Sequence, residues 1–92
     1  MTYSIILTPE AEKHLHEWQR SGQKKILKKI AALFEELTLH PTTGTGKVEQ
    51  LKGSLTGLWS RRIDHGSRMI YRIEDERIIV TVISLRGHYG DK

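Results

Sequence analysis

Residues 44–71 read GTGKVEQLKGSLTGLWSRRIDHGSRMIY, and the fold that we predict is built around this segment. Its second half alternates on the strand period of two over residues 58–64, and alternates again over residues 67–73. His65 and Gly66 stand between the two runs, and a two-residue connection of this kind is typical of a tight hairpin turn. The stretch therefore predicts an antiparallel β-hairpin.

The alternation on the returning strand separates its side chains into two sets. Arg68, Ile70 and Arg72 fall on one face, whereas Met69 and Tyr71 fall on the other. Arg68 is thus expected to be held on a sheet surface. A rigidly held guanidinium can engage two oxygens of a phosphate at once, so Arg68 is a candidate phosphate ligand. The alternative is a solvated strand residue without a ligand.

Outward from the hairpin, the chain predicts a strand and two helices before it and one strand after it. We expect a strand over residues 3–8 and then a helix that begins with Thr8 as N-cap and Pro9 at its first position and is broken at Ser21-Gly22. A second helix is expected over residues 23–39, and a last strand over residues 77–85. Helical spacing predicts the buried stripe of the first helix at Ala11, Leu15 and Trp18, and that of the second helix at Ile26, Leu27, Ile30, Ala31, Leu33, Phe34 and Leu37. The β-branched run of the last strand indicates a central strand with both faces covered.

This order of elements, βααβββ, indicates an α+β fold of two layers. We expect a single domain over residues 1–92, because a chain of 92 residues leaves no room for a second core. Both helices should pack on one face of a mainly antiparallel sheet. The other face would then be partly open, and Arg68 would lie on it.

Composition narrows the classes of function and ligand. The net charge of +4 suggests an acidic partner such as nucleic acid or an acidic protein segment. With no cysteine, and with the five histidines outside the paired spacing of a metal site, we expect neither a metal nor a cofactor. The N-terminus lacks the basic leader and long apolar run of a signal peptide, and no stretch is long enough for a membrane span. We expect a soluble cytoplasmic protein.

The residue types suited to metal-free cleavage of RNA occur together in this chain. Such cleavage needs a base for the 2′-hydroxyl proton, a cation for the phosphate and an acid for the departing 5′-oxygen. Glu49, in a polar connector over residues 42–56, can accept a proton, Arg68 supplies the cation, and His88 can carry a proton near neutral pH. Tyr89 can stack on a base or donate its hydroxyl. A loop salt bridge for Glu49 is the competing interpretation.

Several runs carry a resemblance to a known family. They are GKVEQLKGSLTGLWSRRI, then SRMIY, then the HY pair at His88 and Tyr89, together with WQ and KKI in the predicted helices. In these runs the chain resembles the YoeB/Txe family of bacterial toxins in the wider RelE/ParE superfamily. The resemblance extends over nearly the whole sequence.

The resemblance implies a microbial-ribonuclease-like fold of the RelE/YoeB type and a function. The function is that of the toxin of a type II toxin-antitoxin system: a metal-independent, ribosome-dependent endoribonuclease (mRNA interferase) that cuts mRNA in the A site and inhibits translation. The implied partners are the ribosome, mRNA and a YefM-type antitoxin with an extended acidic tail. Operator DNA would be reached only through the antitoxin complex, and a homodimer is left open.

The resemblance also implies roles for single residues. The general base falls on Glu49, the phosphate-binding arginine on Arg68, the general acid on His88 and the terminal tyrosine on Tyr89. Cations that hold mRNA or ribosomal RNA fall on Lys47, Lys52, Arg61 and Arg62. Two departures stand out: Gly87 replaces a usual aromatic residue, and residues 90–92 extend the chain beyond Tyr89.

Two other functions remain open. One is a ParE-like poison that binds DNA gyrase and performs no chemistry, which the shared architecture allows. The presence of both a base and an acid argues against it. The other is a small basic module that binds RNA or the ribosome without cutting.

Overall fold

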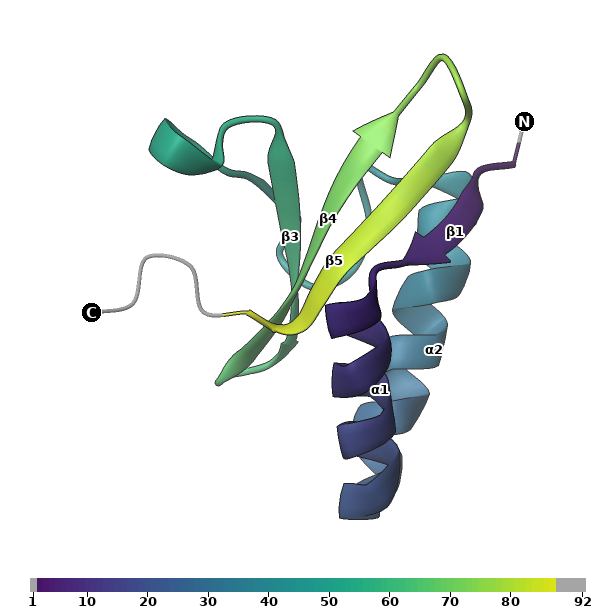
Figure 1. The fold of residues 1–92 in the computed structure, drawn as a ribbon, viewed down its shortest axis with the longest axis vertical. Coiled ribbons are helices and arrows are strands. Elements are labelled where there is room, and N and C mark those ends of the chain that lie inside the picture. The colour runs from purple at the N-terminus through teal and green to yellow at the C-terminus, as the bar shows by residue number, and fades with distance from the viewer. Residues whose placement is uncertain (1, 88–92) are drawn as a thin grey trace.

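The computed structural model describes residues 2–87, which form a twisted sheet with two helices on one face (Figure 1). The elements follow in the order β1 (Ser4–Leu7), α1 (Pro9–Ser21), α2 (Lys24–Leu39), β2 (Glu49–Gln50), the 3₁₀ turn η1 (Gly53–Leu55), β3 (Leu58–Asp64), β4 (Ser67–Glu74) and β5 (Ile79–Gly87). The predicted order βααβββ is confirmed. The structure adds β2 and η1 inside the connector that the sequence left without regular structure. No helix in the described part is long and apolar enough to cross a bilayer.

The sheet has the strand order β1-β5-β4-β3-β2. β1 runs parallel to β5, and the other neighbours are antiparallel. β5 therefore has a strand on each side, as predicted for a central strand. Only one of its faces is fully buried, however: Val80, Val82 and Leu85 are inaccessible to solvent, whereas Thr81 and Ile83 are partly exposed. The prediction that both faces are covered was wrong, because the helices cover only one side of the sheet.

The hairpin follows the prediction closely. β3 and β4 pair in antiparallel register with His65 and Gly66 in the turn between them, and the Gly66 N–H donates to Asp64 Oδ1 at 2.9 Å. A shift of register occurs between Arg62 and Asp64, next to the turn. The alternation that the sequence predicted holds at the beginning of β4, where Met69 and its cross-strand neighbour Arg61 face the helices.

The first helix begins and ends where its sequence predicts. Thr8 is the N-cap, and its Oγ1 accepts a hydrogen bond from the Ala11 N–H at 3.1 Å. Pro9 occupies the first helical position, where a missing N–H costs nothing. Gly22 ends the helix with φ of 73°, a left-handed conformation that glycine adopts without steric cost.

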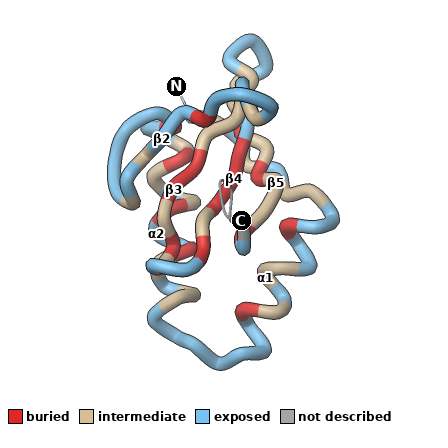
Figure 2. The backbone as a smooth tube through the Cα atoms, turned by 90° about the vertical axis from the view of Figure 1, so that its left-hand side faces the viewer, coloured by how far each residue is buried: buried red, intermediate tan, exposed pale blue. Residues whose placement is uncertain are grey.

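The core lies between the helical stripes and the covered face of the sheet, and it appears as the buried positions on the facing sides of both layers (Figure 2). The buried apolar residues are Ala11 and Trp18 of α1, Ile30, Leu33 and Leu37 of α2, Ile63 of β3, Met69 and Tyr71 of β4, and Val80, Val82 and Leu85 of β5. Ala31, which the sequence placed in the stripe, is exposed. It follows Ile30 and is therefore rotated by about 100° around the helix axis, away from the sheet.

Candidate functional site

The candidate site lies on the face of the sheet opposite the helices. In an antiparallel sheet, cross-strand partners point to the same face, and so do residues two apart on one strand. Glu49 pairs with Ser60, and Arg62 pairs with Arg68. These four side chains therefore share one face, while Arg61, between Ser60 and Arg62, points toward the helices.

Glu49 and Arg68 are in contact on this open face. Arg68 Nη2 lies 3.2 Å from Glu49 Oε1, and Arg68 Nη1 donates to Ser60 Oγ at 3.1 Å. The Arg68 side chain is 19% exposed and that of Glu49 is 49% exposed, so the pair is held on the sheet with one side open to solvent. The prediction that Arg68 sits on a sheet surface is confirmed. Ser60 was missed by the sequence analysis, because its contact with Arg68 depends on the pairing register of β3 with β4.

Three of the four predicted RNA-binding cations lie at the surface. Lys47 is exposed and has a positive φ of 52°, and Lys52 is exposed at the beginning of η1. Arg62 is partly exposed on the same face as Arg68. The surface around the Glu49–Arg68 pair therefore carries several positive charges, which suits a polyanionic ligand.

The fourth cation, Arg61, is not at the surface. Its side chain is completely buried between the sheet and the loop that follows α2. Direct contact with RNA, which the resemblance implied for Arg61, does not fit this position. The reason is that β3 places adjacent residues on opposite faces, so Arg61 and Arg62 cannot both face a ligand on the open side.

Arg61 is instead surrounded by acceptors. Nε donates to the Tyr71 hydroxyl at 3.1 Å, and Nη1 donates to Glu36 Oε1 at 2.7 Å and to the Thr45 carbonyl at 3.4 Å. Nη2 donates to the Thr43 carbonyl at 2.7 Å and also to the His40 carbonyl. Every donor that a guanidinium carries has an acceptor in this arrangement.

The two side chains bonded to Arg61 titrate away from their ordinary values. Burial raises the pKa of Tyr71, and the hydrogen bond and positive charge of Arg61 offset only part of that rise. For Glu36, burial acts to raise the pKa, but the hydrogen bonds from Thr45 and the charge and hydrogen bond of Arg61 outweigh it, so the pKa of Glu36 is lowered. Glu36 therefore remains a carboxylate at neutral pH and pairs with the arginine.

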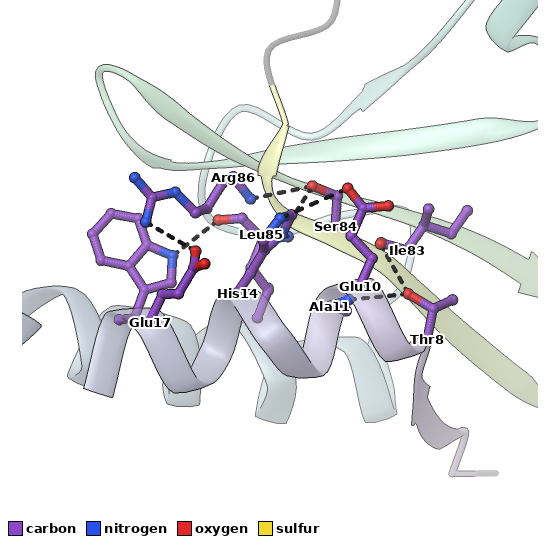
Figure 3. A network of polar contacts seen from close by, with 10 residues as sticks. Thr8, Glu10, Ala11, His14, Glu17, Ile83, Ser84, Leu85 and Arg86 are labelled. Atoms are coloured by element: carbon purple, nitrogen blue, oxygen red, sulfur yellow. Dashed lines mark hydrogen bonds and ion pairs between the residues drawn. The ribbon is translucent and has the colours of Figure 1, made fainter. Parts of the chain in front are cut away.

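The end of β5 is attached to α1 by a group of polar contacts (Figure 3). Trp18 Nε1 donates to the Leu85 carbonyl at 3.1 Å, and the Leu85 N–H donates to His14 Nδ1 at 3.2 Å. Arg86 pairs with Glu17 at 3.4 Å, and its guanidinium lies 5.0 Å from the centre of the Trp18 ring. Trp18 is thus a core residue, as its place in the helical stripe predicts, and it also holds β5.

The remaining predicted site residues, His88 and Tyr89, lie outside the described residues. The last described residue, Gly87, pairs with Arg68 across β4 and β5. Within residues 2–87, no three histidine, aspartate or glutamate side chains are grouped so that they could hold a metal ion. The described part of the candidate site therefore consists of Glu49, Arg68, Ser60 and the cations around them.

Comparisons with known proteins point to one family. Residues 7–89 match the family model described as a YoeB-like toxin of a bacterial type II toxin-antitoxin system. The chain is 40% identical over 84 residues to the toxin YoeB of Synechocystis sp., a match that covers 91% of this chain and 95% of the relative. Among solved structures, a YoeB/ParE toxin from Agrobacterium tumefaciens superposes with a TM-score of 0.87 at 34% identity, over 94% of this chain and 99% of that one.

Two further structures come from one relative. YoeB of Staphylococcus aureus, 33% identical, matches as a dimer with a TM-score of 0.84 and in a heterotetrameric YoeB-YefM complex with a TM-score of 0.81. In both, the match covers 97% of this chain and all of the Staphylococcus aureus chain. The chain therefore belongs to the family of YoeB-like toxins of bacterial type II toxin-antitoxin systems.

Proposed function

We propose that this protein is a ribosome-dependent endoribonuclease that cleaves mRNA in the A site by metal-independent acid-base catalysis and so inhibits translation. The observation that carries the proposal is the contact between Glu49 and Arg68 on the open face of the sheet. A base and a phosphate-binding cation 3.2 Å apart can act on one 2′-hydroxyl and its neighbouring phosphate.

In this mechanism Glu49 removes the proton from the 2′-hydroxyl, whose oxygen then attacks the adjacent phosphorus. Arg68 stabilises the negative charge that grows on the phosphate oxygens, and Ser60 holds the guanidinium in orientation through Nη1. His88 gives a proton to the departing 5′-oxygen, and Tyr89 stacks on a base or donates its hydroxyl. Lys47, Lys52 and Arg62 bind the RNA backbone.

The need for a ribosome fits the size and charge of the molecule. A chain of 92 residues with a net charge of +4 has few groups with which to orient a flexible mRNA by itself. Programmed ribosomes would present the message in a fixed conformation, and the basic residues around the site would bind ribosomal RNA as well as mRNA. Orientation of this kind supplies a large share of catalysis in reactions where the protein carries few catalytic groups.

The antitoxin would be of the YefM type. Its support is the Staphylococcus aureus relative, which forms a complex with YefM and matches over 97% of this chain. An acidic antitoxin segment would be attracted by the cations of the open face. Operator DNA would be bound by the antitoxin within the complex. A homodimer of this chain, like that of the Staphylococcus aureus relative, is a further expected assembly, and the mass of the purified toxin in solution tests it.

The test is primer extension on a defined message in programmed ribosomes, with wild-type protein, two matched pairs of variants and His88→Ala. Glu49→Gln and His88→Ala should abolish the cut at the A-site codon, whereas Glu76→Gln, in the exposed β4–β5 turn, should leave it unchanged. Arg68→Lys should weaken cleavage, and Arg77→Lys, at the other end of β4 and β5, is its matched control. Glu49 is 49% exposed, and an ion pair with one side open to solvent contributes on the order of 1 kcal/mol to stability, so the Glu49 and Arg68 variants should remain folded. Cleavage that persists in both Glu49→Gln and His88→Ala contradicts the assignment.

A second function has one observation in its favour. The Agrobacterium tumefaciens neighbour, with a TM-score of 0.87, is a YoeB/ParE toxin, and this name is compatible with a ParE-like gyrase poison. Such a toxin would act by binding and would tolerate the loss of Glu49. Gyrase-dependent DNA breaks in cells that produce the protein, with their messages intact, would favour this function over the nuclease.

A further inference from the structure

We propose that Arg61 is a positioning residue for the nuclease site: its buried guanidinium holds the loop over residues 40–46 in place and thereby fixes Glu49 relative to Arg68. The inference rests on the proposed function of Glu49 and Arg68. Arg61 itself touches neither of them, because it lies on the opposite face of the sheet.

The loop depends on Arg61 because it has little structure of its own. Residues 40–48 contain turns and bends but no helix or strand. Arg61 reaches three carbonyls of this loop, at His40, Thr43 and Thr45. A single guanidinium thus supplies the hydrogen bonds that a neighbouring strand would otherwise provide.

Two other contacts join the loop to the body of the fold around the same guanidinium. Glu36 Oε1, which accepts from Arg61, also accepts from the Thr45 N–H at 2.8 Å. The Tyr71 hydroxyl, which accepts from Arg61 Nε, donates to the Pro41 carbonyl at 2.7 Å. The beginning and the end of the loop are therefore both connected to Arg61, through β4 and through α2.

The packing around the loop leaves no space for it to move inward. A Cβ atom on Gly44, which has φ of 126°, would lie 2.4 Å from Glu36 Oε1 and 3.0 Å from Arg61 Nη1. A Cβ atom on Gly46 would lie 3.0 Å from the Arg62 carbonyl. The backbone of the loop thus touches the Arg61–Glu36 pair and β3 directly, so a change in the pair is transmitted to the loop.

The loop leads straight into the strand that carries Glu49. β2 contains only two residues, Glu49 and Gln50, so its own ladder cannot define its position. It is held at its ends by the Arg62 N–H, which donates to the Gly46 carbonyl at 2.5 Å, and by the Leu51 N–H, which donates to Leu58 O at 2.9 Å. The first of these bonds lies at the end of the loop that Arg61 holds. If the loop shifts, that bond weakens and Glu49 moves away from Arg68.

The shape of the guanidinium matters as well as its charge. Arginine presents five N–H donors in a planar fork, whereas the lysine ammonium is a compact charge with three donors. Five acceptors from α2, the loop and β4 surround Arg61, and a lysine cannot reach all of them. Arg61→Lys therefore retains the charge opposite Glu36 and releases part of the loop.

The first measurement is single-turnover cleavage on programmed ribosomes, over a range of protein concentrations, by wild type, Arg61→Lys and Arg77→Lys. Displacement of a catalytic group by about 1 Å can cost two orders of magnitude in rate, so we expect the maximal rate constant of Arg61→Lys to fall by about tenfold to a hundredfold. The half-saturating concentration should not change, because Lys47, Lys52 and Arg62 remain. Arg77→Lys should behave as wild type.

The second measurement is amide hydrogen exchange of the same proteins without ribosomes. In Arg61→Lys the amides of Arg62 and Leu51, which anchor β2, should exchange faster, whereas the amide of Thr8, bonded to the Val82 carbonyl, should keep its protection. Equal loss of protection at all three amides, or full cleavage activity in Arg61→Lys, would overturn the inference. If wild type does not cut mRNA, the proposed nuclease function fails, and the exchange data still decide whether Arg61 holds β2.

A second pair of variants covers the case in which Arg61→Lys does not fold. Glu36→Gln removes the negative charge opposite the guanidinium, Tyr71→Phe removes the hydroxyl acceptor of Nε, and both leave Arg61 in place. Each should lower the rate constant of cleavage and speed exchange at the Arg62 amide, without a change in half-saturation. Wild-type rates and exchange in both variants would refute the positioning role.

Discussion

Replacement of Arg61 by methionine should cost this domain a large part of its stability. The change keeps most of the aliphatic volume of the side chain and removes all five donors and the charge. Arg61 is fully buried, and its ionic partner Glu36 is only partly exposed. The variant therefore removes the donors of a fully buried guanidinium and leaves the Glu36 carboxylate, which is 30% exposed, without its cation.

The size of this loss in stability depends on which hydrogen-bond partners of Arg61 can bond to another group in the variant. The Tyr71 hydroxyl keeps its bond to the Pro41 carbonyl, and Glu36 keeps the Thr45 N–H. His40, Thr43 and Thr45 are exposed, so water can reach their carbonyls after a small local rearrangement. The cost is thus concentrated in the charge-assisted bonds and the broken ion pair, for which we expect about 3–5 kcal/mol. Against a total of about 5–15 kcal/mol for a domain of this kind, the variant should fold but melt at least about 12 °C lower.

The assay is equilibrium unfolding in urea at pH 7, followed by the fluorescence of Trp18 and Trp59. The matched control is Arg77→Met, because the Arg77 side chain is 72% exposed and its loss should change the free energy of unfolding by no more than about 0.5 kcal/mol. The reasoning is refuted if Arg61→Met unfolds within about 1 kcal/mol of wild type with an unchanged denaturant slope. That result would mean that the buried guanidinium is no more important to the fold than a surface cation.

Three further changes test other parts of the structure. The pKa of Glu36 is lowered in the folded state, so its contribution to stability is present above the ordinary carboxyl value of about 4.3 and is lost as the pH falls through the folded pKa. Glu36→Gln should therefore be less stable than wild type at pH 7, and the gap in urea midpoint should be smaller at about pH 3. A gap that is the same at both pH values would contradict this. Thr8→Ala removes the N-cap of α1 and the hydrogen bond that Oγ1 donates to the Ile83 carbonyl at 3.0 Å. It should lower the free energy of unfolding in urea by about 1–2 kcal/mol, and an unchanged value would show that the cap is dispensable. Trp18→Phe keeps a ring in the core but leaves the buried Leu85 carbonyl without its indole donor. We expect calorimetry to show a free energy of unfolding that is lower by about 1–3 kcal/mol, and an unchanged value would mean that water replaces the donor.

Much of the fold was predictable because its signals are local. Thr8 before Pro9, Gly22 after a helical stripe and His65-Gly66 between two alternating runs each act on the few residues beside them, and all three predictions are confirmed. The placement of Arg68 on a sheet surface followed in the same way from a period of two. The roles of Glu49, His88 and Tyr89 came from a resemblance, and they remain predictions that the cleavage assays test.

The two helices, the hairpin and the face on which Arg68 lies follow from the order of the amino acids, because helix caps, turn residues and side-chain periodicity act over a few neighbouring positions. The parallel pairing of β1 with β5, the support of Arg68 by Ser60, and the burial of Arg61 while Arg62 stays near the surface arise only when the elements pack together. In the sequence the two arginines are adjacent and chemically identical. Their difference arises from Glu36 and three loop carbonyls that lie 16 to 25 positions earlier in the chain and meet Arg61 only when α2 packs on the sheet. No local sequence pattern predicts these contacts, because the acceptors that stabilise the buried charge of Arg61 come close to it only in the folded chain.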